Sequence, residues 1–437
     1  MYNNLFMMKF ILIFLLSFLF SEPTFVVSTN NNPYPGKIFI HAMSGASSDD
    51  YMTILDENLD FYWLIKNQSK GMDFKLNNSK LTYFHNPNEQ LSEPFWIVAD
   101  HTMAEIDSVI CSSGMTDFHD IVITDNNTYI VQSYDKQIVD FSSIGGDEYT
   151  LINEILRIQE FDSSNNLIFD WFAYDHLNIN DYISDTDLIL QSPVNQIIWM
   201  HGNSIDVDFD NNLILSNRKS SEVIKIHRTT GEIIWIMGGP LNEFQFLEDP
   251  LNGFEMQHDV TRIGNGNIIV FDNRSIANLG ARSRVAEYAI DELNKTATLV
   301  WEFYHPDGYV ARAMGSAQRL PNQNTFINWG VVQAQGQHIG ASIMEVDYEG
   351  NIVLELKFDN YQAYKATKSN FEFSIPMQIG DINLDNILNV QDIICAINYI
   401  LSNNDTHSIF NLYKIDTNLD QTINIIDIID IINRVLD

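Results

Sequence analysis

The chain is short of basic residues. Its 437 residues hold 24 Lys and Arg against 58 Asp and Glu, so the formal net charge at pH 7 is -34. Nucleic-acid phosphates and anionic membrane surfaces repel a protein this acidic, and we expect neither as a partner. The charge suits a soluble exported protein, although a need for solubility alone would account for it equally well.

Cysteine is nearly absent. Cys111 and Cys395 are the two cysteines, and they fall in segments assigned below to different domains, so we expect no structural disulfide. Because no CxxC spacing occurs, neither a zinc site nor thioredoxin-like chemistry is indicated.

The sequence also lacks an apolar run long enough to cross a bilayer. The N-terminal run covers residues 10–20 after Lys9, whereas a membrane span needs about 20 residues. A cation, a short apolar core and a polar segment predict a signal peptide over residues 1–24, and hence a secreted, periplasmic or cell-surface protein. A buried N-terminal strand is the alternative, since no clear cleavage triplet follows.

Short apolar runs separated by Asn, Asp and Gly fill residues 37–358, which is typical of strands and turns. Four segments share a polar start, a strand, an Asn-rich turn and a second strand; they begin at His119, His201, His258 and Ser316. Further strands lie between them, and four strands per repeat indicate propeller blades rather than a sandwich or barrel. We expect an all-β, six-bladed β-propeller over residues 25–376, with one or two blades before residue 107 and an N-terminal strand closing the ring.

The composition changes near residues 374–378, where a second domain over residues 378–437 is predicted. Two twelve-residue segments there place oxygen atoms at positions 1, 3, 5, 9 and 12 and a backbone carbonyl at position 7. Because a hard cation takes six to eight oxygen ligands, we expect two EF-hand-like Ca²⁺ sites, each leading into a helix. Turns that merely cap helices are the alternative. The expected ligands are Asp381, Asn383, Asp385, Ile387, Asn389 and Asp392 in the first loop, and Asp416, Asn418, Asp420, Thr422, Asn424 and Asp427 in the second.

This duplicated pattern, with Asp at position 12, resembles a type I dockerin, and the resemblance implies a small α-helical calcium-binding domain with a cohesin-like partner. Two features depart from that family. Asn386 and Gln421 replace the usual Gly at position 6, where the backbone turns sharply. Positions 10 and 11, Val390–Gln391 and Ile425–Ile426, are not the small hydroxylated residues expected for cohesin recognition. The resemblance to dockerins therefore supports calcium binding more strongly than it supports a cohesin-like partner.

The three histidines at the repeat starts predict a shared site. The innermost strands of a propeller line its channel, so residues at corresponding strand starts converge. A single such histidine would more often be a surface or core residue, but three in register favour a site. Arg218 is the best candidate cation and Arg284 a weaker one; a solvated loop arginine is the alternative for Arg218.

Several segments resemble the arylsulfotransferase family in its order. The resemblance implies a six-bladed enzyme in which a histidine attacks the sulfur of a phenolic sulfate ester, forming a sulfohistidine that a phenolic acceptor discharges without a phosphoadenosine cofactor. A non-catalytic binding propeller and an aryl sulfate hydrolase remain the alternatives. The segments are residues 116–120, 199–206, 215–218, 230–239, 257–259, 271–273, 283–284 and 315–320.

The same resemblance assigns roles to individual residues. His258 matches the nucleophile, and a neutral imidazole with a reference pKa of about 6.5 is competent for that role at pH 7. The other matches would donate to the sulfuryl oxygens and the departing phenoxide; they are His119, His201, Asn203 and Arg218. Ser204, Arg284 and Ser316 are the candidate substrate contacts, Ser316 standing where the family residue has no secure counterpart.

Overall fold

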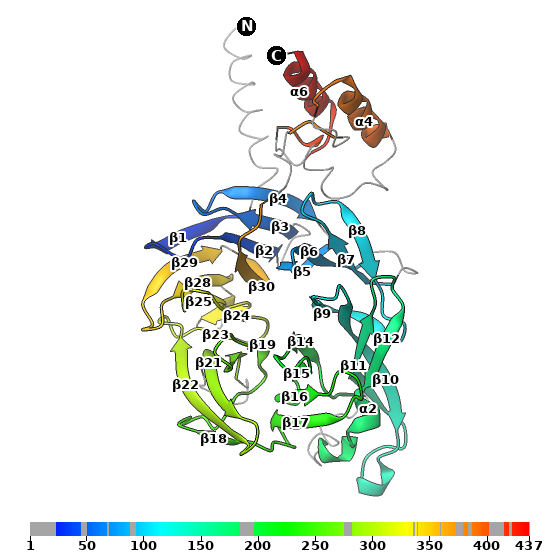
Figure 1. Ribbon diagram of the computed structural model, residues 1–437, viewed down its shortest axis with the longest axis vertical. Coiled ribbons are helices and arrows are strands. Elements are labelled where there is room, and N and C mark those ends of the chain that lie inside the picture. The colour runs from blue at the N-terminus through cyan, green and yellow to red at the C-terminus, as the bar shows by residue number, and fades with distance from the viewer. Residues whose placement is uncertain are drawn as a thin grey trace.

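The computed structural model describes residues 23–44, 50–67, 70–87, 93–183, 196–274, 282–334, 337–338, 340–358, 360–372, 379–382, 387–401, 415–418 and 422–436. Within these residues, six mainly antiparallel sheets of four or five strands are arranged in a ring around a central axis (Figure 1). The predicted six-bladed β-propeller is therefore confirmed. The predicted leader falls almost wholly on residues 1–22, outside the described residues, as does the predicted boundary at residues 374–378.

Each blade runs from an inner strand at the channel to an outer strand at the rim. The first three blades, from inside outward, are β30 (Tyr361–Ser369), β2 (Lys37–Ser44), β3 (Asp50–Leu55) and β4 (Phe61–Asn67); β5 (Lys70–Asn77), β6 (Lys80–His85), β7 (Phe95–Ala99) and β8 (Glu105–Val109); and β9 (Met115–Ile123), β10 (Tyr129–Val139), β11 (Thr150–Phe161) and β12 (Leu167–Phe172). The last three are β14 (Gly202–Val207), β15 (Leu213–Asn217), β16 (Glu222–Ile226) and β17 (Ile233–Gly238); β19 (His258–Arg262), β20 (Ile268–Asp272), β21 (Arg284–Asp291), β22 (Thr296–Tyr304) and β18 (Gln245–Leu247); and β24 (Ser316–Arg319), β25 (Thr325–Asn328), β28 (Ser342–Val346), β29 (Ile352–Phe358) and β1 (Phe25–Asn30).

Several short elements lie outside the four-stranded core of the blades. Strand β13 (Gln196–Ile198) runs parallel to β11 and leads into the fourth blade. The others are η1 (Ser142–Ile144), α2 (Ala173–His176) and η2 (Ile179–Asp181), together with a three-stranded sheet of β23 (Val310–Ala311), β26 (Val332–Ala334) and β27 (Gln337–His338).

The ring is closed at two places. Strand β30, late in the chain, forms the inner strand of the first blade by pairing with β2. Strand β1 forms the outer edge of the last blade by pairing with β29. An N-terminal strand does take part in closure, as expected, but the inner strand comes from the other end of the propeller.

The hydrophobic core consists of several layers that lie between neighbouring blades, because each sheet is covered on both faces by the sheets next to it. Strands β15 and β20 are buried at every position, which explains why each begins with consecutive apolar residues, Leu213–Leu215 and Ile268–Phe271, and not with an alternating pattern. Trp235 from the fourth blade packs with Val270 from the fifth in one such layer. This packing holds the inner strands rigidly around the channel.

Two helices follow the propeller, α4 (Val390–Leu401) and α6 (Ile425–Leu436), and each begins within its predicted loop, as expected from the sequence. Their buried faces meet through Ala396, Ile428 and Ile431. No helix in the described part of the chain has the length and apolarity needed to cross a membrane. Asn383, Asp385 and Asp420 lie outside the described residues, so the dockerin-like fold stays a prediction.

Candidate active site

A repeated hydrogen bond sets the register of the inner strands. On four of the six inner strands one side chain accepts a backbone N–H from the next inner strand: Asp120 from Ile205, Ser204 from Val260, Asp259 from Ala317 and Ser316 from Ala366, at 2.9–3.2 Å. The residues one position earlier are therefore equivalent, and they are His119, Asn203, His258, Gly315 and Tyr364. His201 stands two residues before Asn203, so the expectation that it shares the register of the other two histidines is wrong.

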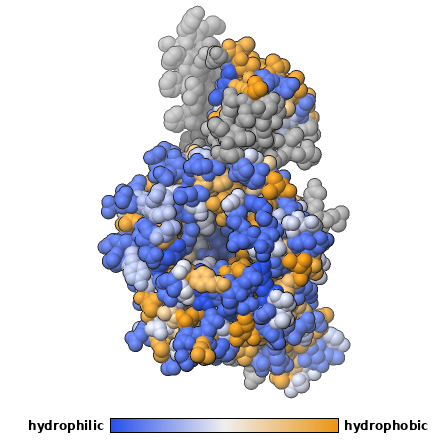
Figure 2. Space-filling model, in the orientation of Figure 1, coloured by the Kyte–Doolittle hydropathy of each residue, from blue (hydrophilic) through white to orange (hydrophobic). Residues whose placement is uncertain are grey.

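The three histidines nevertheless come together. The rings of His119 and His201 lie 4.8 Å apart, edge to face. Positive charge on either ring, or on Arg218, would lower the pKa of His258, which places all four side chains in one electrostatic site. Figure 2 shows a face of the ring hollowed near its middle, with hydrophilic residues around the hollow.

His258 is held in one tautomer by Asn273. The Asn273 amide nitrogen donates to the carbonyls of Ala311 (2.8 Å) and Met314 (2.9 Å), so its oxygen must face His258 Nδ1, 2.7 Å away. Nδ1 therefore carries the proton. Nε2 keeps its lone pair, toward which the backbone N–H of Met314 points at a long 3.3 Å.

The surroundings also keep His258 uncharged. Its side chain is 2% exposed. Burial, and secondly the nearby Arg218 and histidines, lower the pKa of His258 well below its ordinary value, although the bond to Asn273 opposes the shift. At neutral pH His258 is thus a neutral imidazole with an available nitrogen lone pair, the form that a nucleophile requires.

His119 is paired with a buried carboxylate. Its Nδ1 lies 2.6 Å from Asp117 Oδ1, which also accepts from Gln132 at 2.6 Å. Burial alone would raise the pKa of Asp117, but His119 and these hydrogen bonds hold it below the ordinary value. Phe118 stacks on the His119 ring at 4.1 Å and Tyr364 contacts it edge-on. The imidazole therefore has little freedom to rotate.

His201 has a similar partner but a more open position. Its Nδ1 lies 2.6 Å from Glu154 Oε2, and the two side chains are 26% and 27% exposed, against 4% for His119. Both residues have left-handed backbones, with φ of 58° for His201 and 53° for Glu154, a conformation that costs free energy for residues other than glycine. Of the three histidines, His201 is the one that solvent reaches.

Arg218 supplies the positive charge of the site. It lies in the turn after β15, where its backbone N–H donates to the His201 carbonyl at 3.0 Å. One guanidinium nitrogen donates to the Arg312 carbonyl at 3.1 Å, and no described carboxylate lies within ion-pair distance. Burial lowers the pKa of Arg218, partly offset by Glu154. Donors of the guanidinium therefore remain available to an anion.

Asn203 and Ser204 lie on the inner strand of the fourth blade. The Asn203 side-chain amide donates one hydrogen bond, to the Gln257 carbonyl at 2.6 Å. The Oδ1 atom of Asn203 has no hydrogen-bond partner among the described residues. The Ser204 hydroxyl accepts the inter-blade bond from Val260. The catalytic role expected of Asn203 and the substrate contact expected of Ser204 both stay predictions.

Arg284 is not part of the site, which corrects the expectation from sequence. It is fully buried within the fifth blade, and all five of its N–H bonds have partners, chiefly Asp249, Asp272 and Glu302. With no donor left, it cannot bind a substrate oxygen. Ser316 likewise uses its hydroxyl to join β24 to β30, donating to the Ala366 carbonyl and accepting from the Ala366 N–H.

A buried ionic network crosses the channel beside the histidines. Lys365, the neighbour of Tyr364, lies 3.1 Å from Asp120 and 3.3 Å from Asp259, and Lys75 pairs with Asp120 and Asp73. Although burial alone would lower it, these carboxylates raise the pKa of Lys365. Burial raises the pKa of Asp73 to about 6. The network links four blades through Asp73, Asp120, Asp259 and Lys365 and gives the site a rigid support.

The sequence analysis did not predict the hydrogen-bond partners of the histidines, because these partners lie on other strands or do not stand at a distinctive spacing from the histidines. Asp117 could have been noticed, since it stands two residues before His119 on the same strand. Asn273 lies in the family-like segment 271–273, but no role was assigned to it, and it is 15 residues from His258. Nothing local marks Glu154, which is 47 residues from His201.

The fold and the site together define a β-propeller with a histidine-lined centre. A family model described as arylsulfotransferase (ASST) matches residues 24–367, and the chain belongs to this family. The family suggests sulfuryl transfer between a phenolic donor and a phenolic acceptor. No curated protein matches the sequence significantly.

The solved structures that match this chain share little sequence with it. A protein of unknown function from Bacteroides caccae has a TM-score of 0.46 at 11% identity, covering 77% of this chain and 99% of that one. A Lactobacillus plantarum protein has a TM-score of 0.43 at 10% identity, covering 77% and 100%. Virginiamycin B lyase from Staphylococcus aureus has a TM-score of 0.35 at 9% identity, covering 76% and 88%. Likeness at this level says nothing about activity.

Proposed function

We propose that the protein is an exported, cofactor-independent aryl-sulfate sulfotransferase that works through a sulfohistidine on His258. The observation that carries this proposal is the state of His258: Nδ1–H is committed to Asn273, burial keeps the ring neutral, and the Nε2 lone pair meets only a long 3.3 Å hydrogen bond from the Met314 N–H among the described residues, with Arg218 near enough to lower the pKa of the ring. That combination suits a nucleophile for a sulfate ester.

In the first step, His258 Nε2 attacks the donor sulfur, the bond from sulfur to the aryl oxygen breaks, and the phenoxide leaves. The sulfurylated ring keeps its Nδ1 proton, so it carries the positive charge that makes it a good leaving group. Arg218, whose guanidinium keeps donors available, stabilises the charge on the sulfuryl and phenoxide oxygens.

In the second step, the acceptor oxygen attacks the same sulfur and the S–N bond breaks, which restores neutral His258. The acceptor phenol must lose a proton. His201 is placed to take it, because its Nδ1 is oriented by Glu154 and its ring is partly exposed. The proton taken by His201 is then released to the phenoxide formed in the first step. The net reaction moves a sulfuryl group from the donor to the acceptor phenol and a proton in the opposite direction.

The intact mass of the protein after treatment with an aryl sulfate donor tests the proposal. The wild type should gain one sulfuryl group, and His258→Ala should gain none. Release of the donor phenol should require an added phenol. Release without it would indicate a hydrolase, and an unlabelled wild type across several donors would favour a non-catalytic binding propeller.

We further propose that the C-terminal loops bind two Ca²⁺ ions. The described oxygen donors fit a hard cation. In both loops the position-12 carboxylate is fully buried and accepts N–H bonds from positions 2 and 9: Asp392 from Ile382 and Asn389, and Asp427 from Thr417 and Asn424. Two separate loops thus reach the same local geometry, and Asp381 and Asp416 are also buried.

Export to a periplasmic, secreted or cell-surface location, directed by the leader over residues 1–24, completes the proposal. A cohesin-like protein is the proposed partner of the C-terminal domain. Pull-down with a cohesin in the presence and absence of Ca²⁺ tests this partner, and N-terminal sequencing of the mature protein tests the leader.

A further inference from the structure

Two side chains of β10 reach from the third blade to the strand that follows His201. The Tyr134 hydroxyl donates to the Gly202 carbonyl oxygen at 2.6 Å, and the Gln132 amide nitrogen donates to the same atom at 2.8 Å. This close approach needs glycine, because a Cβ at residue 202 would lie 2.6 Å from Leu156 Cδ1 and 3.2 Å from Gln132 Oε1. Gln132, Tyr134 and Gly202 form what we call the Gly202 clamp.

The same two side chains also contact the His119 pair. The Gln132 amide nitrogen donates its other hydrogen to Asp117 Oδ1 at 2.6 Å, the oxygen that faces His119 Nδ1. The Tyr134 hydroxyl oxygen lies 3.3 Å from that ring nitrogen. Since the ionised Asp117 and the Gly202 carbonyl can only accept hydrogen bonds, the nitrogen of the Gln132 amide must face both. Gln132 thus joins the partner of one histidine to the backbone beside another.

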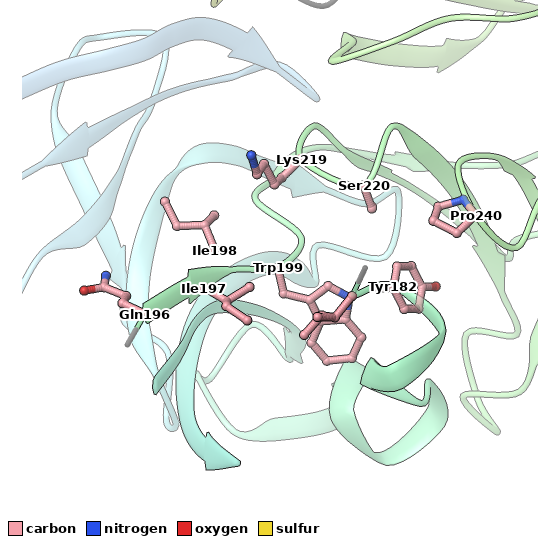
Figure 3. Close-up of a pocket in the computed structure, with 9 residues that line it drawn as sticks. Tyr182, Gln196, Ile197, Ile198, Trp199, Lys219, Ser220 and Pro240 are labelled. Carbon is pink, nitrogen blue, oxygen red and sulfur yellow. The ribbon is translucent and has the colours of Figure 1, made fainter. Parts of the chain in front are cut away.

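The segment before His201 is held less firmly toward the third blade. Up to Trp199 it is well packed, and Figure 3 shows Trp199 close to Tyr182, with ring centroids 5.3 Å apart. The next bonds to β11 are long, since the N–H groups of Met200 and His201 lie 3.4 and 3.5 Å from the Glu154 carbonyl. The two clamp bonds, at 2.6 and 2.8 Å, are much shorter. The clamp therefore does more than this stretch of backbone to fix the strand beside the histidine.

The hydrogen bonds continue toward the nucleophile. Asn203 follows Gly202, and its side-chain amide donates to the carbonyl of Gln257, which stands directly before His258. The carbonyl held by the clamp belongs to the peptide that joins Gly202 to Asn203. A shift of this peptide would therefore disturb Asn203 as well as the histidine before it.

We infer that Gln132 and Tyr134 are positioning residues for sulfuryl transfer, which act through the Gly202 clamp to keep His201 in a fixed place relative to His119. The inference rests on the proposed function. The Tyr134 ring also stacks on the His201 ring, with centroids 6.1 Å apart and planes inclined by 24°. One side chain thus holds both the ring and the adjoining backbone.

The two half-reactions should respond differently to loss of the clamp. Sulfurylation uses His258, whose proton is fixed by Asn273 and not by the clamp. Transfer to the acceptor uses His201 as the base, and the efficiency of a base depends on its distance from the proton that it removes. Loss of the clamp should therefore slow transfer more than labelling.

Tyr134→Phe and Gln132→Met test this, because each removes the donors and keeps most of the volume. Tyr83→Phe and Gln159→Met are the matched controls. Tyr83 and Gln159 are buried like Gln132, and each donates to a carboxylate outside the site, at 2.9 and 3.2 Å. Single-turnover kinetics with 4-nitrophenyl sulfate and phenol measure the two half-reactions separately. The NMR signals of the histidine Nδ1 protons report ring positions independently of turnover.

We expect each clamp variant to slow transfer by about fivefold or more, the equivalent of one hydrogen bond, while labelling stays within about twofold. The double variant should slow transfer by more than the product of the two single effects, because it leaves the buried Gly202 carbonyl without either donor. The Nδ1 proton signals of His119 and His201 should move in the clamp variants and not in the controls.

Unchanged transfer, equal slowing of both half-reactions, or the same slowing in the controls overturns the inference. If the wild type takes no label but the Nδ1 signals of His119 and His201 move only in the clamp variants, the positioning role stands and the proposed function fails. If the wild type is labelled and those signals stay fixed in the clamp variants, the proposed function stands and the positioning role fails.

Discussion

The bond between Asn273 and His258 gives the sharpest prediction about chemistry. Asn273→Asp replaces the neutral oxygen that accepts from His258 Nδ1 with a carboxylate. A hydrogen bond to a charged group contributes about 1.5–3 kcal/mol against about 1 kcal/mol for a neutral one. At 1.36 kcal/mol per pKa unit, the pKa of His258 should rise by about one unit.

The sign of the effect on rate follows from the protonation state. In the wild type the pKa of His258 lies well below 6.5, so the sulfurylation rate should stay flat as the pH falls from 8 to 6. In Asn273→Asp the acidic limb should begin about one pH unit higher, because protonation of Nε2 removes the lone pair. The assay is the initial rate of labelling by an aryl sulfate, followed by intact mass from pH 4.5 to 8.5.

Asn328→Asp is the matched control. The Asn328 amide donates to the Ala363 and Tyr364 carbonyls at 2.9 and 3.2 Å, as Asn273 does to its two carbonyls, but its oxygen accepts from the Gly330 N–H rather than from a histidine. The control should share any loss of stability and leave the pH profile unmoved. Equal profiles for Asn273→Asp and the wild type, or an equal shift in both variants, would refute the reasoning.

Four further outcomes are expected. Arg218→Ala should lower turnover by roughly 100-fold while some labelling survives, because charge stabilisation is lost but the nucleophile remains; full-rate labelling would contradict this. Glu154→Gln should slow transfer to the acceptor more than labelling, measured by single-turnover kinetics of each half-reaction; equal slowing would argue against His201 as the acceptor's base. Arg284→Met should lower the free energy of unfolding by about 3–5 kcal/mol in urea melts, since it leaves Asp249 and Asp272 buried without their partner, with labelling retained below the melting range; loss of labelling in folded protein would restore a substrate role. Chelation of Ca²⁺ should abolish a separate C-terminal transition in calorimetry of the full chain and leave the propeller transition in place; unchanged melting would count against the calcium sites.

The propeller architecture could be predicted because it depends on short sequence patterns that repeat along the chain. Each blade repeats a strand, an Asn-rich turn and a second strand, and both faces of the sheets are covered, so the apolar runs mark the strands directly. The inner strands β9, β14, β19 and β24 begin at or near the four predicted starts. The helices α4 and α6 were predictable for the same reason, since each follows an Asp-rich loop and has an apolar face.

The sequence alone also determined which residues form the centre of the site: His119, His201, His258 and Arg218 are brought to one place by strands whose order the repeat reveals. Only the tertiary structure decided their register and their partners. The register of the inner strands depends on which backbone groups pair between them, and a single sequence does not show this pairing. In the structure Asn203, and not His201, occupies the position equivalent to His119 and His258. The proton positions depend on Glu154 and Asn273, contributed by different strands from the histidines they contact. Arg284 shows the converse. Its place beside a family-like motif suggested a substrate ligand, but Asp249, Asp272, Glu302 and the Gly253 carbonyl accept all of its N–H bonds, a result that only packing could settle.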